Sequence, residues 1–203
     1  MQGKTSFWPK LILIVFCIYK FYSIICRYST TASASAFQAE DEGSIPFTRS
    51  NDKSIMIPKI IHYSWISGDE YPPQIQACID TWGDKLKGYQ FINWNRDTFD
   101  FSSSRFLTEA YADKNYAFCS DFLRIYALYN YGGIWLDTDV HVIKPYDDFL
   151  HLPYFFCHEQ FFGYLKFSEM VIEAATMGAE KGHPIFSCAL QWYNTHSYNY
   201  LTK

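Results

Sequence analysis

Two aspartates, Asp137 and Asp139, directly follow the large apolar residues Ile134-Trp135-Leu136. Side chains at positions i and i+2 of a strand point to the same side, so the two carboxylates are predicted to lie together at the end of a buried strand. Adjacent carboxylates repel each other unless a cation lies between them. Oxygen ligands of this kind suit a hard divalent ion, Mg²⁺ or Mn²⁺, which keeps coordination positions for substrate phosphates.

The Asp-x-Asp tripeptide alone is a weak signal, because it occurs by chance in many chains and a solvated loop is the alternative interpretation. Its context favours a site. Gly132 and Gly133 form a turn before the apolar run, so the carboxylates are expected to emerge directly from a core strand. Ligand sites in α/β sheets lie beyond the carboxyl ends of strands, which agrees with this position.

A second polar pair, Asp121 and Arg124, lies three residues apart on a predicted helix over residues 116–131, so its members are neighbours on one helix face. An ordinary surface ion pair, worth a few tenths of a kcal/mol, is the alternative. The helix is otherwise mostly apolar, and Ser120, Asp121 and Arg124 form its main polar patch. This patch favours the lining of a pocket.

His62 and Trp65 lie on a predicted buried strand over residues 57–66. Taken alone, His62 is more typical of a core histidine with satisfied hydrogen bonds, and Trp65 of a core aromatic residue. Trp65 gains a binding role if the end of this strand faces the same cleft as the aspartates, because an indole ring stacks well on a nucleobase.

The surrounding elements predict an α/β fold. A strand over residues 57–66 is followed by a helix that opens at Pro72-Pro73 and by a second strand over 89–94, an order typical of a parallel strand pair. After the helix over 116–131, a strand is predicted from Ile134 through Ile143, and a last helix over 169–181.

The N-terminal 54 residues differ in composition from the rest of the chain. Residues 11–26 are mostly apolar but include Lys20, and they are shorter than the roughly 20 residues that span a bilayer. A single-pass membrane anchor is favoured for residues 1–27, while a cleaved signal peptide and a spurious extension stay open. Residues 28–54 are predicted to be a flexible linker, and residues 55–203 the globular domain.

Composition restricts the class of protein. The 203 residues are 49% hydrophobic and 19% charged, which is normal for a folded domain. The net charge is −4 and no basic stripe is present, so nucleic acid is not an expected partner. The six cysteines have no zinc-like spacing, and free thiols are favoured over disulfides.

The residues from Ala117 to Asp139 resemble the signature of the glycosyltransferases with a DXD sugar-binding region. This GT32-type group includes bacterial capsular-polysaccharide transferases and the yeast initiating mannosyltransferases. The stretches Ile57–Trp65 and Met177–Pro184 resemble further segments of the same group, so the resemblance covers about residues 55–190. It implies a GT-A fold with a mixed, mostly parallel sheet flanked by helices.

The resemblance also implies a function. The expected activity is metal-dependent transfer of a sugar, with retention, from a nucleotide-diphosphate donor to a glycan or glycolipid acceptor in polysaccharide or glycan synthesis. By similarity, Trp65 stacks on the base, Asp121 and Arg124 hold sugar hydroxyls, Asp137 contacts ribose and sugar, and Asp139 binds Mn²⁺ or Mg²⁺. His62 is a further candidate for donor binding. The sugar, the base and the acceptor are not fixed by the sequence.

Two alternatives stay open. One is a metal-dependent phosphohydrolase with an aspartyl nucleophile, although His141 stands where that class has Thr or Val. The other is an inactive relative that binds nucleotide sugars, because relatives continue beyond the position of Lys203. The expected location is at a membrane, in the Golgi lumen if the source is eukaryotic and on the cytoplasmic face if it is bacterial.

Overall fold

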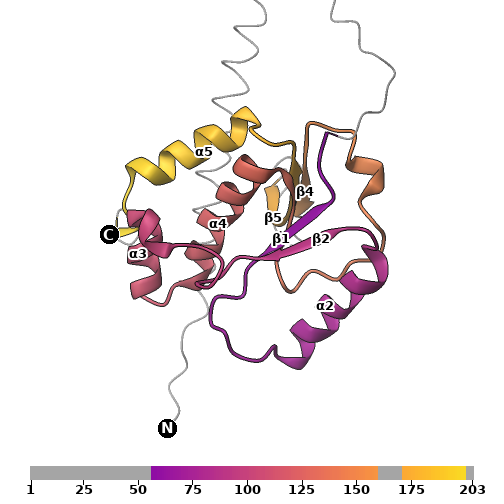
Figure 1. Ribbon diagram of the computed structural model, residues 1–203, viewed down its shortest axis with the longest axis horizontal. Helices are drawn as coiled ribbons and strands as arrows, with labels where there is room; N and C mark the ends of the chain where they lie inside the picture. Colours follow the sequence, from indigo (N-terminus) through magenta and orange to yellow (C-terminus); the bar gives the residue numbers. More distant parts are fainter. Residues whose placement is uncertain (1–55, 160–170, 200–203) are drawn as a thin grey trace, which may run out of the picture. The chain divides into compact units, whose positions relative to one another are not determined.

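The computed structural model describes residues 56–159 and 171–199 (Figure 1). The predicted anchor over residues 1–27 and the linker over 28–54 lie outside this part of the chain. Residues 52–157 and 174–203 form one compact unit, and it contains every predicted site residue. Within the described ranges, none of the helices combines the length and apolar character needed to cross a bilayer.

The centre of the fold is a five-stranded sheet with the strand order β2-β1-β3-β5-β4. β1 pairs in parallel with both β2 and β3, whereas β5 pairs antiparallel with β3. The mixed sheet and its helices confirm the predicted α/β class. The strands are β1 Ile60–Tyr63, β2 Gln90–Asn93, β3 Gly133–Leu136, β4 Tyr154–Glu159 and β5 Val171–Ala179.

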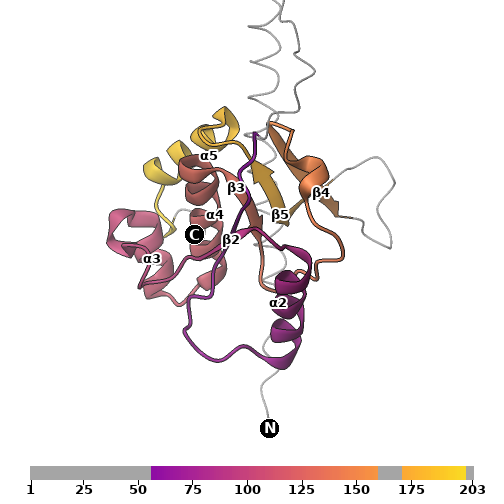
Figure 2. The same ribbon diagram turned by 45° about the vertical axis from the view of Figure 1, so that its right-hand side comes forward.

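Helices cover both faces of the sheet (Figure 2). α2 packs on one face, where its buried Trp82 and Leu86 join the core formed with Ile61, Ile134 and Leu136. α4 contacts β1 and β3 from the other face, and α3 and α5 pack against α4. The helices are α2 Pro73–Lys85, α3 Arg105–Ala112, α4 Tyr116–Tyr131 and α5 Pro184–Thr195, with short 3₁₀ turns η2 Phe101–Ser103 and η3 Asp147–Phe149.

The alternation of side chains along β3 determines on which face of the sheet Trp135 and Asp137 lie. Ile134 and Leu136 belong to the core on the α2 side. Trp135 therefore points to the α4 side, and Asp137, two residues further, continues in that direction. The alternation along the strand thus places the side chain of Asp137 against the polar residues of α4.

Gly132 and Gly133 join α4 to β3 at very close range. Gly132 has φ 68° and ψ −177°, and Gly133 has φ 112°, both outside the region that other residues adopt readily. A Cβ on Gly133 would lie 2.6 Å from the backbone oxygen of Ile60. Glycine is therefore needed here for the contact between β3 and β1 as well as for the turn.

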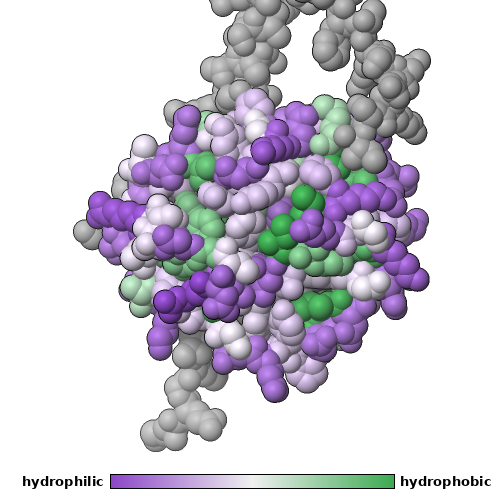
Figure 3. All heavy atoms as spheres, viewed as in Figure 1, coloured by the Kyte–Doolittle hydropathy of each residue, from purple (hydrophilic) through white to green (hydrophobic). Residues whose placement is uncertain are grey.

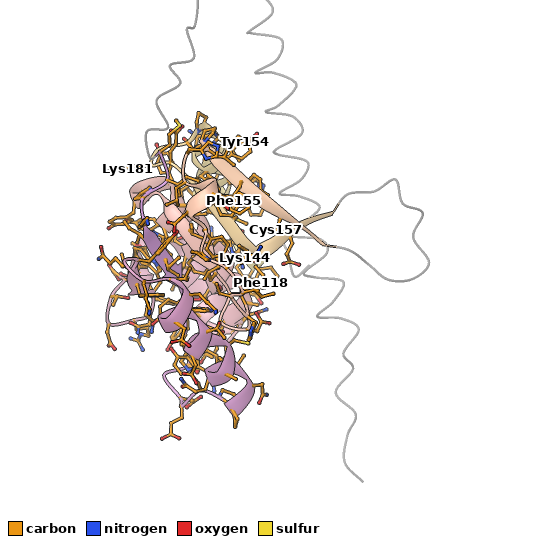
Figure 4. All side chains as sticks on the ribbon, turned by 90° about the vertical axis from the view of Figure 1, so that its right-hand side faces the viewer. Phe118, Lys144, Tyr154, Phe155, Cys157 and Lys181 are labelled. Atoms are coloured by element: carbon orange, nitrogen blue, oxygen red, sulfur yellow. The ribbon has the colours of Figure 1, made fainter. Side chains whose placement is uncertain are left out.

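Two sequence predictions about secondary structure are wrong. The strand after the glycines ends at Leu136 instead of continuing to Ile143, and residues 169–181 contain β5 instead of a helix. Residues 171–179 include good helix formers, but pairing with β3 gives their backbone an antiparallel ladder. Gly178 also lets Phe155 of β4 (Figure 4) approach so closely that a Cβ would overlap its ring.

The surface is mixed in character. Figure 3 shows small apolar patches separated by hydrophilic residues on one face. Such scattered exposure is ordinary for a folded domain.

Candidate active site

The site lies at the carboxyl edge of the parallel strands. β1 ends at Tyr63 and β3 at Leu136, and their parallel pairing brings the residues that follow to the same edge. Asp137 begins this edge after β3, and its backbone N–H donates to the carbonyl of Ala175 at 2.9 Å. The backbone of the first aspartate is therefore still held by β5.

Arg124 of α4 joins the two predicted polar groups. Its Nη2 donates to Oδ1 and Oδ2 of Asp137 at 2.8 and 3.1 Å, and its Nη1 lies 3.2 Å from Oδ1 of Asp121. Arg124 is 7% exposed, while the side chains of Asp121 and Asp137 are 26% and 33% exposed. One buried guanidinium thus holds two carboxylates that remain partly open to solvent.

Trp135 is a member of this network that the sequence analysis did not single out. Its Nε1 donates to Oδ1 of Asp137 at 2.8 Å, and the guanidinium of Arg124 lies 5.6 Å from the centre of its ring. Asp137 follows directly after β3, two residues beyond Trp135, so the alternation of side chains along the strand could have predicted this contact.

The charges in this network shift one another. Burial raises the pKa of Asp121 to about 6, Arg124 opposes this shift, and Asp137 adds to it. Burial by itself lowers the pKa of Arg124, but the carboxylates of Asp137 and Asp121 outweigh it and raise that pKa. Arg124 is therefore positively charged, and its charge favours the ionised form of Asp121. Its Nε is buried and has no hydrogen-bond partner within the described residues.

Trp65 lies directly beyond β1, at the same edge. Its backbone N–H donates to Oδ1 of Asn93 at 3.0 Å and its indole N–H donates to the carbonyl of Asp69 at 2.6 Å. The ring packs against Tyr71, with centroids 4.9 Å apart. Ser64, the residue before Trp65, donates its hydroxyl proton to the hydroxyl oxygen of Ser120 in α4 at 3.0 Å. The loop that carries Trp65 is thus tied to the helix residue next to Asp121.

His62 is not brought into a position to contact a ligand. It is 0% exposed, the indole N–H of Trp94 donates to its Nδ1 at 3.1 Å, and its Nε2 lies 2.8 Å from the carbonyl of Gly132. Because Nδ1 accepts, the proton is on Nε2, and the ring is neutral. The geometry matches the alternative of a core histidine with satisfied hydrogen bonds, and it offers no support for donor binding.

The burial of His62 is expected to make the free energy of unfolding depend on pH in the acidic range. Burial lowers the pKa of His62 to about 4, although the hydrogen bond to Gly132 partly opposes the shift. Since the unfolded chain takes up the proton near its usual pKa of about 6.5, the free energy of unfolding is expected to fall as the pH drops from about 6.5 to 4, by up to roughly 3 kcal/mol.

Urea unfolding at several pH values checks this expectation. His62→Gln should unfold with a smaller dependence on pH across this window, whatever its absolute stability. His151→Gln, a change at an exposed histidine, is the control and should keep the slope of the wild type. An unchanged slope in His62→Gln would contradict the assignment.

Comparison with known proteins relates this part of the chain to a family of glycosyltransferases. Residues 72–156 match the family model of the glycosyltransferase sugar-binding region containing a DXD motif. This part of the chain is therefore similar to the sugar-binding region of that family. The DXD region includes α2, Asp121, Arg124 and both aspartates of the motif, so the network described above lies inside it.

Several curated proteins are similar to the chain. Inositol phosphoceramide mannosyltransferase 3 of Schizosaccharomyces pombe is 28% identical over 157 residues, which cover 74% of this chain and 41% of that protein. An uncharacterized glycosyltransferase of Acanthamoeba polyphaga mimivirus is 32% identical over 142 residues, covering 64% and 53%. Mannosyl phosphorylinositol ceramide synthase SUR1 of Saccharomyces cerevisiae is 28% identical over 150 residues, covering 68% and 35%.

The chain therefore spans about half or less of the length of these relatives. The solved structure of the PaToxG glycosyltransferase aligns with a TM-score of 0.45 and 19% identity, covering 66% of this chain and 59% of that chain.

The residues of the DXD region fit a divalent ion. Arg124 binds both carboxylate oxygens of Asp137. Asp139 is exposed to solvent. Within the described ranges no group of three His, Cys, Asp or Glu residues is placed to hold a metal. Mg²⁺ and related ions commonly use one or two carboxylates and complete their coordination with water and substrate phosphates. Asp139 fits such a site. The strand geometry predicted for the two aspartates is absent, because β3 ends at Leu136 and the N–H of Val140 turns back to the carbonyl of Asp137.

Proposed function

We propose that this protein binds a nucleotide-diphosphate sugar at the carboxyl edge of its sheet and transfers the sugar to an acceptor. The observation that supports this most strongly is the network of Arg124, Asp121 and Asp137 within a DXD region, beside the exposed Asp139. The partly exposed carboxylates accept hydrogen bonds from sugar hydroxyls. The Nε–H of Arg124 is a further donor whose hydrogen-bonding capacity a ligand would satisfy.

Each residue has a role in this proposal. Asp139 holds the divalent ion, Mn²⁺ or Mg²⁺, which supplies positive charge where the diphosphate leaves. Arg124 fixes the position of both Asp121 and Asp137 and supplies the positive charge between them. Trp65 offers its ring face to the base, on a loop tied to α4 through Ser64 and Ser120. Transfer with retention of configuration is part of the same proposal.

The relatives suggest the acceptor. Two of them carry inositol phosphoceramide or mannosyl phosphorylinositol ceramide in their names, so we propose a glycolipid of this kind as the acceptor and mannose as the first sugar to test. A lipid acceptor agrees with the apolar run at residues 11–26, and we propose that the protein works at a membrane. The lumen of the Golgi suits a eukaryotic source, and the cytoplasmic face a bacterial one.

Thermal melting with UDP-, GDP- and CMP-sugars, each with and without Mn²⁺, tests the donor. The matching sugar nucleotide is expected to raise the melting temperature by roughly 5–10 °C at about one hundred times its Kd, and only with the metal present. Asp139→Asn should lose this shift, because it removes the negative charge that holds the ion.

Asp113→Asn, an equivalent change at an exposed aspartate after α3, is the matched control and should retain the shift. A shift of the wild type that is the same in EDTA would contradict the metal-dependent site. Binding without release of nucleoside diphosphate, in the presence of the lipid acceptor, would identify an inactive binding protein instead of a transferase.

A further inference from the structure

The chain that follows the DXD motif is held by one face of helix α2. The thiol of Cys78 donates to the carbonyl of Asp139 at 3.3 Å, and the indole N–H of Trp82 donates to the carbonyl of Val140 at 2.8 Å. The backbone N–H of Val142 donates to the hydroxyl of Thr81 at 3.0 Å. Three side chains of one helical turn thus bind the backbone of residues 139–142.

The sequence spacing makes this arrangement possible. Residues 78, 81 and 82 of α2 are related as i, i+3 and i+4, so they share one face of the helix. Thr81 donates its own hydroxyl proton to the carbonyl of Cys78 at 2.6 Å. Its oxygen is therefore oriented to accept from Val142, and the helix presents two donors and one acceptor to the segment.

These contacts take the place of a strand partner. Residues 140–143 were predicted to continue β3, but the N–H of Val140 turns back to the carbonyl of Asp137 at 3.0 Å. The next backbone groups bind α2 instead of a neighbouring strand. Val142 is buried in the same core as Trp82, so the segment is anchored by packing as well as by hydrogen bonds.

The anchoring helix is itself firmly placed. Trp82 is 2% exposed, and its ring meets Tyr63 of β1 edge-on at 5.4 Å and lies parallel to Phe91 of β2 at 6.4 Å. The indole thus extends from the core of the sheet to the loop. Any movement of the segment after Asp139 has to break this contact or displace a buried side chain.

We propose that Cys78, Thr81 and Trp82 are positioning residues that set the place of Asp139 for donor binding. This inference rests on the proposed function, since it assigns these side chains to the metal-binding aspartate. They touch neither the donor nor the ion. They act by restricting the backbone that carries the carboxylate, so that binding the ion does not first have to order the loop.

The first readout is independent of any ligand. Thr81→Val keeps the shape of the side chain but removes the acceptor for the N–H of Val142, whereas Thr81→Ser keeps the hydroxyl. Hydrogen exchange of the Val142 amide is expected to speed up at least tenfold in Thr81→Val and to stay within about threefold of the wild type in Thr81→Ser. Equal exchange in the two variants would overturn the clamp.

The second readout is Mn²⁺ binding, measured by electron paramagnetic resonance in the presence of UDP or GDP. Trp82→Phe, Thr81→Val and Cys78→Ala are each expected to bind Mn²⁺ roughly three- to tenfold more weakly, which corresponds to the loss of one hydrogen bond. Cys78→Ser, which keeps a donor, should recover the affinity. Trp94→Phe also loses a buried indole hydrogen bond, the one to His62, and serves as the matched control with unchanged affinity.

The two readouts separate this inference from the proposed function. Faster exchange with unchanged Mn²⁺ affinity would overturn the positioning role while leaving the donor site intact. A wild-type protein that binds no Mn²⁺ with either nucleotide would overturn the proposed function and the positioning role with it, and the exchange data would still decide whether α2 holds the segment. If Trp94→Phe lowered the affinity for Mn²⁺ as much as Trp82→Phe does, the effect would be a general loss of stability, and the positioning role would be overturned.

Discussion

Replacing Arg124 with methionine is expected to abolish donor binding and to lower the free energy of unfolding by about 3–5 kcal/mol. The guanidinium is buried and contacts Asp121 and Asp137 at once. Methionine fills much of the volume but leaves two neighbouring carboxylates without their cation. The pKa of Asp121 is already raised to about 6 in its presence, so removal of the positive charge disfavours ionisation further.

This mechanism has a pH signature. Because the cost comes from ionised carboxylates, the deficit of Arg124→Met in urea unfolding should be largest at pH 7–8 and shrink toward pH 4, where protonation removes the repulsion. Arg105→Met provides the control, since Arg105 pairs with Glu109 on the surface of α3, and it should cost less than about 1 kcal/mol. A loss in Arg124→Met that is independent of pH would point to packing and contradict the electrostatic account.

Gly133→Ala is expected to destabilise the fold by more than about 3 kcal/mol. The added methyl group would meet the backbone oxygen of Ile60 at 2.6 Å and the ring of His62 at 3.1 Å. Both partners are fixed, one by the pairing of β1 and the other by its hydrogen bonds to Gly132 and Trp94. The strands would have to separate, and the edge that carries Asp137 would shift with β3.

Gly88→Ala separates the contact from the backbone conformation. Gly88 also has a positive φ, 84°, but no atom lies within 4 Å of the position of its Cβ. It should therefore cost only the conformational strain, about 1 kcal/mol. Urea unfolding of both variants measures the difference, and equal losses would show that the close approach of β3 to β1 contributes nothing.

The local signals in the sequence predicted the elements with strong periodicity. The helix expected over residues 116–131 is α4 with the same bounds, and the proline pair opens α2 as expected. In both cases an apolar face and a terminal signal agree with the final packing. The strand that begins at the glycines was also found, because three consecutive large apolar residues follow a turn.

The errors arose where partners distant in sequence decide the structure. Residues 171–179 form a strand because β3 offers an antiparallel edge, which no local pattern reveals. Residues 140–143 leave the sheet because side chains of α2 bind their backbone. Cys78 and Trp82 lie on the helix predicted after Pro72-Pro73, and their hydrogen bonds to residues 139 and 140 depend on how that helix packs on the sheet.

The site shows the same division. The i,i+3 spacing predicted the contact between Asp121 and Arg124, and it is present. The contact between Arg124 and Asp137 depends on the packing of α4 on β3 and was not predicted from spacing. His62 and Trp65 were both predicted to lie on one strand and both considered for donor binding. The structure separates them, since one side chain is enclosed in the core and the other lies beyond the strand end.

The two aspartates of the motif are held by hydrogen bonds to different elements of the fold. The backbone of Asp137 is bonded to β5 and that of Asp139 to α2. Under the roles proposed above, substitutions in α2 are therefore expected to affect binding of the ion through Asp139, and substitutions around β5 to affect the contacts of Asp137 with the donor.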